Sequence, residues 1–184
     1  MFTALKKTGK EALVVVDYQV DFVDGTLGFS GAQALEDGIC AEIETTRSAG
    51  NDVIFTFDTH SESADEYLNT PEGKALPIPH CLRGSDGHAL YGKVADCIRP
   101  EDARIFKPTF GSEALAALLK ARGYTKITFV GLVSNICVIS NAILAKTACP
   151  NAQVRVLSAL TASPDAELHK AALDVMRSVQ IIVE

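Results

Sequence analysis

Short runs of β-branched and aromatic residues alternate along this chain with longer segments of helical periodicity. Five of the short runs predict fully buried strands, at 12–16, 53–57, 127–130, 154–157 and 181–183. A weaker sixth strand is predicted at 104–106. The helical spacing of apolar residues predicts four helices, at 32–49, 112–122, 135–147 and 164–178. Strand–helix alternation of this kind predicts an α/β fold, in which an open, mainly parallel six-stranded sheet carries helices on both faces.

The predicted helix ends carry residues that suit them. Gly50 with Asn51, and Gly123, are expected to stop the helices that precede them, because glycine readily adopts the left-handed backbone of a C-terminal cap. Ser163 is expected to be an N-cap, with Pro164 at the first position of the last helix.

Length, charge and cysteine content exclude several classes of protein. The 184 residues are expected to form one domain, 1–184, with an irregular insertion at 58–100 where prolines and glycines interrupt the periodic pattern. Seventeen Lys and Arg against twenty-three Asp and Glu give a net charge of −6, which argues against nucleic acid or a membrane surface as a partner. Five widely spaced cysteines cannot all pair within the chain, so we expect reduced thiols in a cytoplasmic protein.

Three residues with chemically useful side chains follow predicted strands. Asp17 comes directly after the strand at 12–16, Lys107 follows the weak strand, and Cys137 lies in the first turn of the helix after 127–130. The carboxyl ends of parallel strands form the ligand-binding edge of such a sheet. A helix N-terminus favours the thiolate, and such surroundings lower a thiol pKa from ~8.5 to roughly 3.5–7.5. Alternatively, these residues could be a turn aspartate, a solvated lysine and a small buried cysteine.

A possible metal site lies at the start of the insertion. Asp58 and His60 follow a strand and, by alternation along an extended chain, point to the same side. His80 stands among prolines, and a D-x-H pair with a second histidine and a further carboxylate fits a divalent metal. Candidates for that further carboxylate are Glu62, Asp65, Glu66 and Glu72. A bound metal would also keep a long Gly/Pro-rich segment ordered, whereas the alternative is a solvated loop.

Two other patterns are set aside. Gly25, Gly28 and Gly31 do not have the G-x-G-x-x-G spacing of a dinucleotide-binding loop and lie too far from the strand. His88 and His169 are interpreted as a loop residue and a residue on an exposed helix face.

Five segments in order along the chain resemble the isochorismatase-like cysteine hydrolases, and specifically their nicotinamidase (pyrazinamidase) branch. These segments read VVVDYQVDF, FTFDTH, PIPHC, FKPTF and GLVSNICV. The resemblance extends from residue 12 to the final strand and implies the three-layer fold of that family. It implies that Asp17, Lys107 and Cys137 form the catalytic triad. It also implies a cis peptide bond between Leu132 and Val133, with the backbone amides of Val133 and Cys137 as the oxyanion hole.

The resemblance extends to the metal site. The ligands that it implies are Asp58, His60, Glu72 and His80. Glu72 is chosen because Pro71 to Lys74 resembles the P-E-x-K version of the site, and Asp65 and Glu66 are the alternatives. The expected cofactor is one divalent metal, Zn²⁺ first, with Fe²⁺ or Mn²⁺ as alternatives.

The activity implied by the resemblance is hydrolysis of nicotinamide to nicotinate and ammonia through a cysteine thioester, as in NAD salvage. Phe22 and Phe110 are expected to pack on the substrate ring, and a homo-oligomer is expected. The chain departs from the commoner pattern at Thr59, where many nicotinamidases have tryptophan, and at 134–136. The alternatives are a related hydrolase acting on another small amide or on isochorismate, and a binding module without catalysis.

Overall fold

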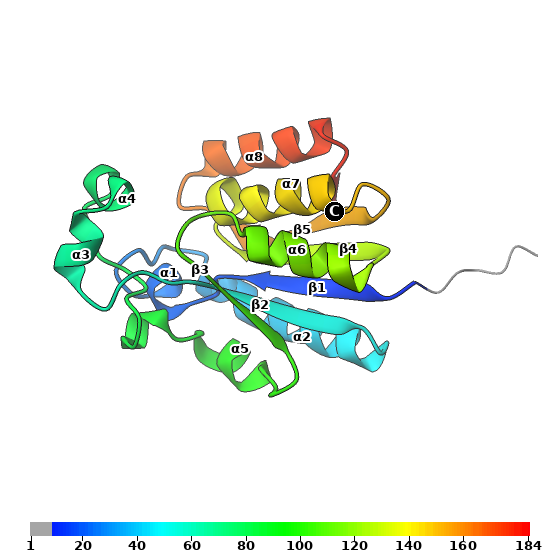
Figure 1. Cartoon of the computed structure of the whole chain (residues 1–184), viewed down its shortest axis with the longest axis horizontal. Coiled ribbons are helices and arrows are strands. Elements are labelled where there is room, and N and C mark those ends of the chain that lie inside the picture. The colour runs from blue at the N-terminus through cyan, green and yellow to red at the C-terminus, as the bar shows by residue number, and fades with distance from the viewer. Residues whose placement is uncertain (1–8) are drawn as a thin grey trace, which may run out of the picture.

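A six-stranded sheet organises residues 9–184, the part of the chain that the computed structural model describes (Figure 1). The strands lie in the order β3-β2-β1-β4-β5-β6, and every neighbouring pair is parallel. Their bounds are Glu11–Val16 for β1, Asp52–Asp58 for β2, Ala103–Lys107 for β3, Lys126–Leu132 for β4, Gln153–Ala162 for β5 and Ile182–Val183 for β6. The predicted α/β fold with a parallel six-stranded sheet is therefore confirmed.

Helices cover both faces of the sheet (Figure 1). One face carries α6 (Glu113–Arg122), α7 (Ile139–Ala148) and α8 (Ala166–Ser178), and the other carries α1 (Val20–Val23), α2 (Glu36–Ser48) and α5 (Gly92–Cys97). In β1, Val14 packs into the first of these cores and Val15 into the second, so both side chains are fully buried. Burial on both faces explains why the strands read as continuous apolar runs. No helix within residues 9–184 has the length and hydropathy needed to cross a membrane.

Side-chain capping sets where the helices begin. The hydroxyl of Ser112 accepts the backbone N–H of Leu115 at the start of α6. The N-cap of α8 is Asp165, whose carboxylate accepts two backbone amides, so the prediction of Ser163 as N-cap was wrong. A carboxylate at this position also interacts favourably with the helix dipole, which explains the later start. The segment 32–49, predicted as one helix, consists of a short 3₁₀ helix, Gln33–Leu35, followed by α2.

The strand that leads to Cys137 requires a glycine near its end. Gly131 in β4 has φ of 103°, and a Cβ atom there would lie 2.1 Å from the carbonyl oxygen of Val16 in β1. The pairing of β4 with β5 shifts register between Phe129 and Gly131, and β5 runs on beyond the predicted 154–157 to Ala162. Glycine at this position therefore allows the ends of β1 and β4 to approach closely.

The segment predicted as irregular begins one residue later than expected and contains short helices. Asp58 is the last residue of β2. The helices of the segment are α3 (Ala64–Leu68), α4 (Pro71–Ala75), a 3₁₀ turn (Asp86–His88) and α5. Figure 1 shows α3 and α4 standing out beyond the carboxyl ends of the strands. Asp21 fixes the base of the segment, because its Oδ2 accepts the backbone N–H of Cys81 at 2.7 Å. His80 is held beside this anchor.

Candidate active site

Three strand ends bring Asp17, Lys107 and Cys137 together. The Lys107 Nζ lies 2.7 Å from Asp17 Oδ2 and 3.5 Å from Cys137 Sγ. Their exposed fractions are 0% for Asp17, 1% for Lys107 and 4% for Cys137. Asp17 follows β1, Lys107 ends β3, and Cys137 lies in the turn after β4. The structure therefore joins the three residues that the sequence placed at separate strand ends.

Three further groups hold this cluster, and one of them, Thr56, was not singled out in the sequence. The Thr56 hydroxyl donates to Asp17 Oδ1 at 2.6 Å and accepts the backbone N–H of Asp17 at 3.2 Å. The Lys107 ammonium donates to the carbonyl of Thr109 at 3.1 Å and lies 3.3 Å from Asp58 Oδ1. The available signal for Thr56 was a single hydroxyl in an otherwise apolar buried strand. Each charged group of the cluster consequently has polar partners, as burial of charge requires.

Burial and mutual charge shift the pKa values of all three residues. Burial raises the pKa of Cys137 well above its ordinary value, and Asp17 and Asp58 raise it further, although Lys107 acts in the opposite direction. The expectation of a lowered thiol pKa was therefore wrong, because loss of hydration outweighs the helix N-terminus. Burial disfavours the Lys107 ammonium, but the negative charges of Asp17 and Asp58 raise its pKa above the usual range. Burial also raises the pKa of Asp17, so its carboxylate is a stronger base than one in water.

The turn that carries Cys137 differs from the start of an ordinary α-helix. Ser134–Val138 forms one π-helical turn before α7, and the Val133 carbonyl accepts the amides of Ile136 and Val138. The peptide bond between Leu132 and Val133 is cis, as the family resemblance implied. Both Val133 and Cys137 line the adjoining cavity. π-helical turns of this kind recur at functional sites.

Asn141 connects this turn to the loop after β3. Its Nδ2 donates to the carbonyl of Cys137 at 2.8 Å and to the carbonyl of Phe110 at 3.0 Å. Its Oδ1 accepts the backbone N–H of Ser112 at 3.0 Å, and the residue is buried. In the sequence this asparagine was visible only as a polar residue within an apolar segment. The contacts fix Cys137 and Phe110 relative to each other.

The two histidines that were set aside also make specific contacts. His169 of α8 places Nδ1 2.8 Å from the hydroxyl of the fully buried Ser134, so it is not simply an exposed helix residue. His88 places Nε2 2.8 Å from the Thr59 hydroxyl. The Thr59 side chain is therefore in hydrogen-bond contact with His88, and Thr59 does not line the cavity beside Cys137. Neither contact has a local sequence signal, since the partners come from different elements.

Four side chains form a compact group of metal-ligand type. The residues are Asp58, His60, Glu72 and His80, whose ligand atoms all lie within 4.8 Å of one another. The Nε2 of His60 is 3.3 Å from Asp58 Oδ2 and 3.6 Å from Glu72 Oε1. The Nε2 of His80 is 3.4 Å from the same Asp58 oxygen. Glu72 lies in the first turn of α4, whereas the alternatives Asp65 and Glu66 are exposed on α3, outside this group.

The polar atoms of this group suit a divalent metal. The Nε2 of His60 is buried and has no hydrogen-bond partner within residues 9–184. The Nδ1 of His80 lies 2.8 Å from the carbonyl of Ile78, which leaves its Nε2 to face the carboxylates. A backbone contact of this kind fixes the tautomer and orientation of a metal-binding histidine. Two imidazoles and two carboxylates form a donor set that first-row divalent metals accept.

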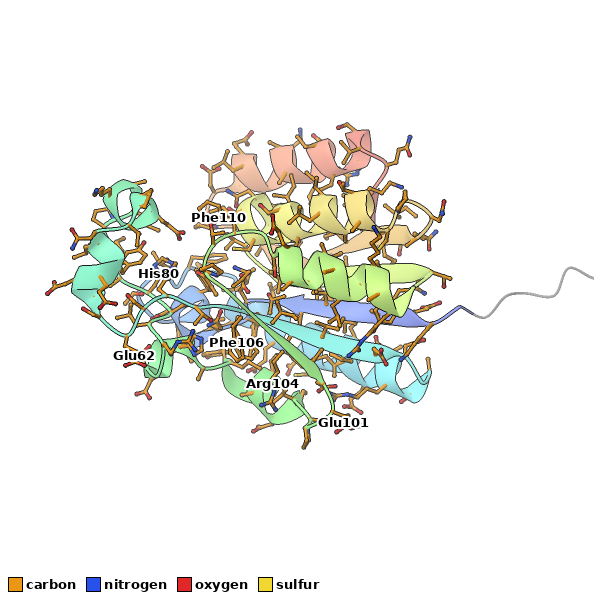
Figure 2. All side chains as sticks on the ribbon, viewed as in Figure 1. Glu62, His80, Glu101, Arg104, Phe106 and Phe110 are labelled. Carbon is orange, nitrogen blue, oxygen red and sulfur yellow. The ribbon has the colours of Figure 1, made fainter. Side chains whose placement is uncertain are left out.

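A cavity of about 310 Å³ lies between the cysteine and the metal-ligand group. Its wall includes Asp58 and His80 of the metal-ligand group together with Val133 and Cys137. The two aromatic residues predicted to contact a substrate ring, Phe22 and Phe110, also line it. Phe22 packs edge-on against His80, with ring centroids 5.6 Å apart. Figure 2 shows His80 on the segment before α5 and Phe110 on the loop after β3. The cavity can hold a small aromatic ring with polar groups at both ends.

Comparisons with known proteins agree with this geometry. The isochorismatase domain, as a sequence family, matches residues 11–184. The chain is 28% identical to the nicotinamidase/pyrazinamidase of Mycobacterium tuberculosis, with 92% of this chain and 96% of that protein covered. The pyrazinamidase/nicotinamidase of Streptococcus mutans superposes with a TM-score of 0.83 at 28% identity, covering 95% of this chain and 100% of that one. The pyrazinamidase of Pyrococcus horikoshii, solved in complex with zinc, superposes with a TM-score of 0.80 at 25% identity, covering 95% of this chain and 98% of that one.

Proposed function

We propose that this chain, which belongs to the isochorismatase family of hydrolases, is a nicotinamidase that converts nicotinamide and water to nicotinate and ammonia. The observation that carries the proposal is the presence of two groups on one cavity. One is the cluster of Asp17, Lys107 and Cys137, whose sulfur lines the cavity, and the other is the metal-ligand group, of which Asp58, Glu72 and His80 line it. A carboxamide and a ring nitrogen on one small molecule would match these two ends. The nicotinamidase relatives described above support the same assignment.

Activation of the nucleophile would fall to Asp17 and Lys107. Burial raises the pKa of the Cys137 thiol, so formation of the thiolate would need a base during the reaction. Asp17, whose pKa burial also raises, would accept the thiol proton. The ammonium of Lys107, 3.5 Å from the sulfur, would stabilise the thiolate as it forms.

The thiolate would then form a bond to the carboxamide carbon. The backbone N–H groups of Val133 and Cys137 would hold the oxyanion, which preorganised amides stabilise strongly. As the carbon–nitrogen bond breaks, protonated Asp17 would deliver its proton to the departing ammonia. Asp17 would next take a proton from water, whose oxygen attacks the thioester carbon. Nicotinate leaves, and the thiol of Cys137 is regenerated.

Substrate positioning would come from the metal-ligand group and the aromatic walls. A divalent metal bound by Asp58, His60, Glu72 and His80 would supply a Lewis-acidic anchor for the ring nitrogen. Phe22 and Phe110 would pack on the ring. Holding the carboxamide beside the sulfur converts a bimolecular attack into a local one, which can supply several kcal/mol of the barrier reduction.

Ammonia release from nicotinamide by the purified full chain tests this proposal. We expect turnover with nicotinamide, loss of turnover in the presence of a chelator, and recovery when Zn²⁺, Fe²⁺ or Mn²⁺ is restored. Benzamide, which lacks the ring nitrogen, is the matched control and should be hydrolysed at least tenfold less efficiently. Metal-loaded protein that leaves nicotinamide intact but hydrolyses isochorismate or an unrelated amide would overturn the proposal.

A further inference from the structure

The cavity of about 310 Å³ beside Cys137 is called the catalytic cavity below. A second cavity, called the side chamber, adjoins it and is larger, at about 650 Å³. The two share four wall residues, Glu72, Leu76, Phe110 and Ile136. The remainder of the side chamber comes mainly from α4 and the loop after β3. Neither Cys137 nor Lys107 lines it, so it holds no second reaction centre. Because four residues line both cavities, the cavities lie side by side, and a substituent that passes these residues would reach from the first into the second.

Three of the four residues that the two cavities share are apolar, and the fourth is Glu72 of the metal-ligand group. Phe110 is 44% exposed and Ile136 is 38% exposed, and both lie at this junction with Leu76. Ala75 and Pro108 continue the apolar surface into the side chamber. Single exposed apolar residues are ordinary, but a contiguous set beside a binding cavity indicates a ligand-binding surface. The mechanism above uses Phe110 for the ring but gives no role to the others.

The charges of the side chamber favour an uncharged occupant. Its ionisable wall residues are His60 and Glu72, and both belong to the metal-ligand group. Among residues 9–184, no Lys or Arg lines the side chamber, so these residues offer no counter-charge to an anionic substituent there. The occupant that matches this wall is an alkyl or aryl group.

The chemistry of the ring determines where such a group is attached. In the proposed function, the ring nitrogen N1 faces the metal-ligand group and the C3 carboxamide faces Cys137. Ring position C2 adjoins both of these anchored positions, and C4 and C6 each adjoin one. C5 alone is meta to both, so a substituent there points away from the metal and from the sulfur.

We propose that the preferred substrates are pyridine-3-carboxamides that carry an apolar substituent at C5, held in the side chamber. This inference rests on the proposed function and narrows its substrate class. The reaction is unchanged: the carbon–nitrogen bond of the carboxamide is hydrolysed, and the substituent stays on the released acid. Binding energy from the substituent should appear mainly as a lower KM, because the group lies away from the reacting atoms.

The test compares kcat/KM for nicotinamide and 5-propylnicotinamide with the metal-loaded full chain. We expect at least a tenfold higher value for the propyl compound, because three carbon groups leave water. If nicotinamide is hydrolysed and the propyl compound is no better, this inference fails while the proposed function stands. If neither amide releases ammonia, the proposed function fails.

Variants of α4 show whether the side chamber is responsible. Ala75→Trp places a large side chain in the side chamber, and Ala75→Leu places a smaller one there. The ratio of kcat/KM for 5-propylnicotinamide to kcat/KM for nicotinamide should therefore fall to about one in Ala75→Trp and to an intermediate value in Ala75→Leu. Lys74→Trp is the matched control, since Lys74 is exposed on the same helix and lines neither cavity. It should retain the wild-type ratio. Metal content is measured in every variant because Glu72 lies on this helix. A wild-type ratio in metal-loaded Ala75→Trp would overturn the inference.

Discussion

Replacing Asn141 with alanine removes three hydrogen bonds that join α7 to the loop after β3. The lost partners are the carbonyls of Cys137 and Phe110 and the backbone N–H of Ser112. A typical hydrogen bond contributes about 0.5–1.5 kcal/mol net, and a buried group left without a partner costs about 1–3 kcal/mol. Because alanine also leaves a small void at a buried position, we expect the free energy of unfolding to fall by about 3 kcal/mol.

Urea denaturation of metal-free protein measures this loss without a contribution from metal binding. With a slope of about 2 kcal/mol per molar urea, the midpoint should fall by about 1.5 M. Thr147→Ala is the matched control, because its hydroxyl only donates to the Ile143 carbonyl on the exposed side of α7. Its stability should stay within about 0.5 kcal/mol of the wild type. An Asn141→Ala midpoint equal to that of the control would refute the role assigned to the asparagine.

Three further changes give expected outcomes at other parts of the site. His80→Ala should reduce the bound metal measured by elemental analysis, whereas His88→Ala should leave it unchanged; equal metal content in both would remove His80 from the ligand set. Thr56→Val removes a hydrogen bond that lowers the pKa of Asp17, so that pKa should rise further. Since Asp17 must be deprotonated to act as a base, the acidic limb of the kcat/KM profile should move to higher pH, and an unmoved limb would argue against that role. His169→Ala removes the hydrogen-bond partner of the Ser134 hydroxyl, in the turn that carries Cys137, and should lower kcat about fivefold with metal content retained. An unchanged kcat would contradict a positioning role for His169.

The convergence of the predicted catalytic residues could be read from the sequence because it depends on two simple rules. Continuous apolar runs identify strands that are buried on both faces, and parallel strands bring their carboxyl ends to one edge. Asp17 and Cys137 follow such strands directly. β3 gave a weaker pattern because it is an edge strand, on which Arg104 and Phe106 are exposed. Lys107 could therefore be placed only approximately.

The supporting contacts could not be predicted, because they join elements that are far apart in the sequence. Asn141 and Ser112 are 29 residues apart, and Ser134 and His169 are 35 apart. The direction of the Cys137 pKa shift was missed for a related reason. A helix N-terminus is visible in the local sequence, but the complete burial that outweighs it depends on the packing of the whole site.

The central claim, that a cysteine thioester carries the hydrolysis, is tested most directly by ammonia release from nicotinamide in the Cys137→Ala variant. Cys149→Ala is the control, because Cys149 follows α7 and lies outside the catalytic cavity. Metal content and thermal midpoint are compared with the wild type in both proteins. Covalent catalysis predicts that Cys137→Ala releases no ammonia above the rate without enzyme, whereas Cys149→Ala remains active. Turnover by folded, metal-loaded Cys137→Ala within tenfold of the wild type would contradict the claim.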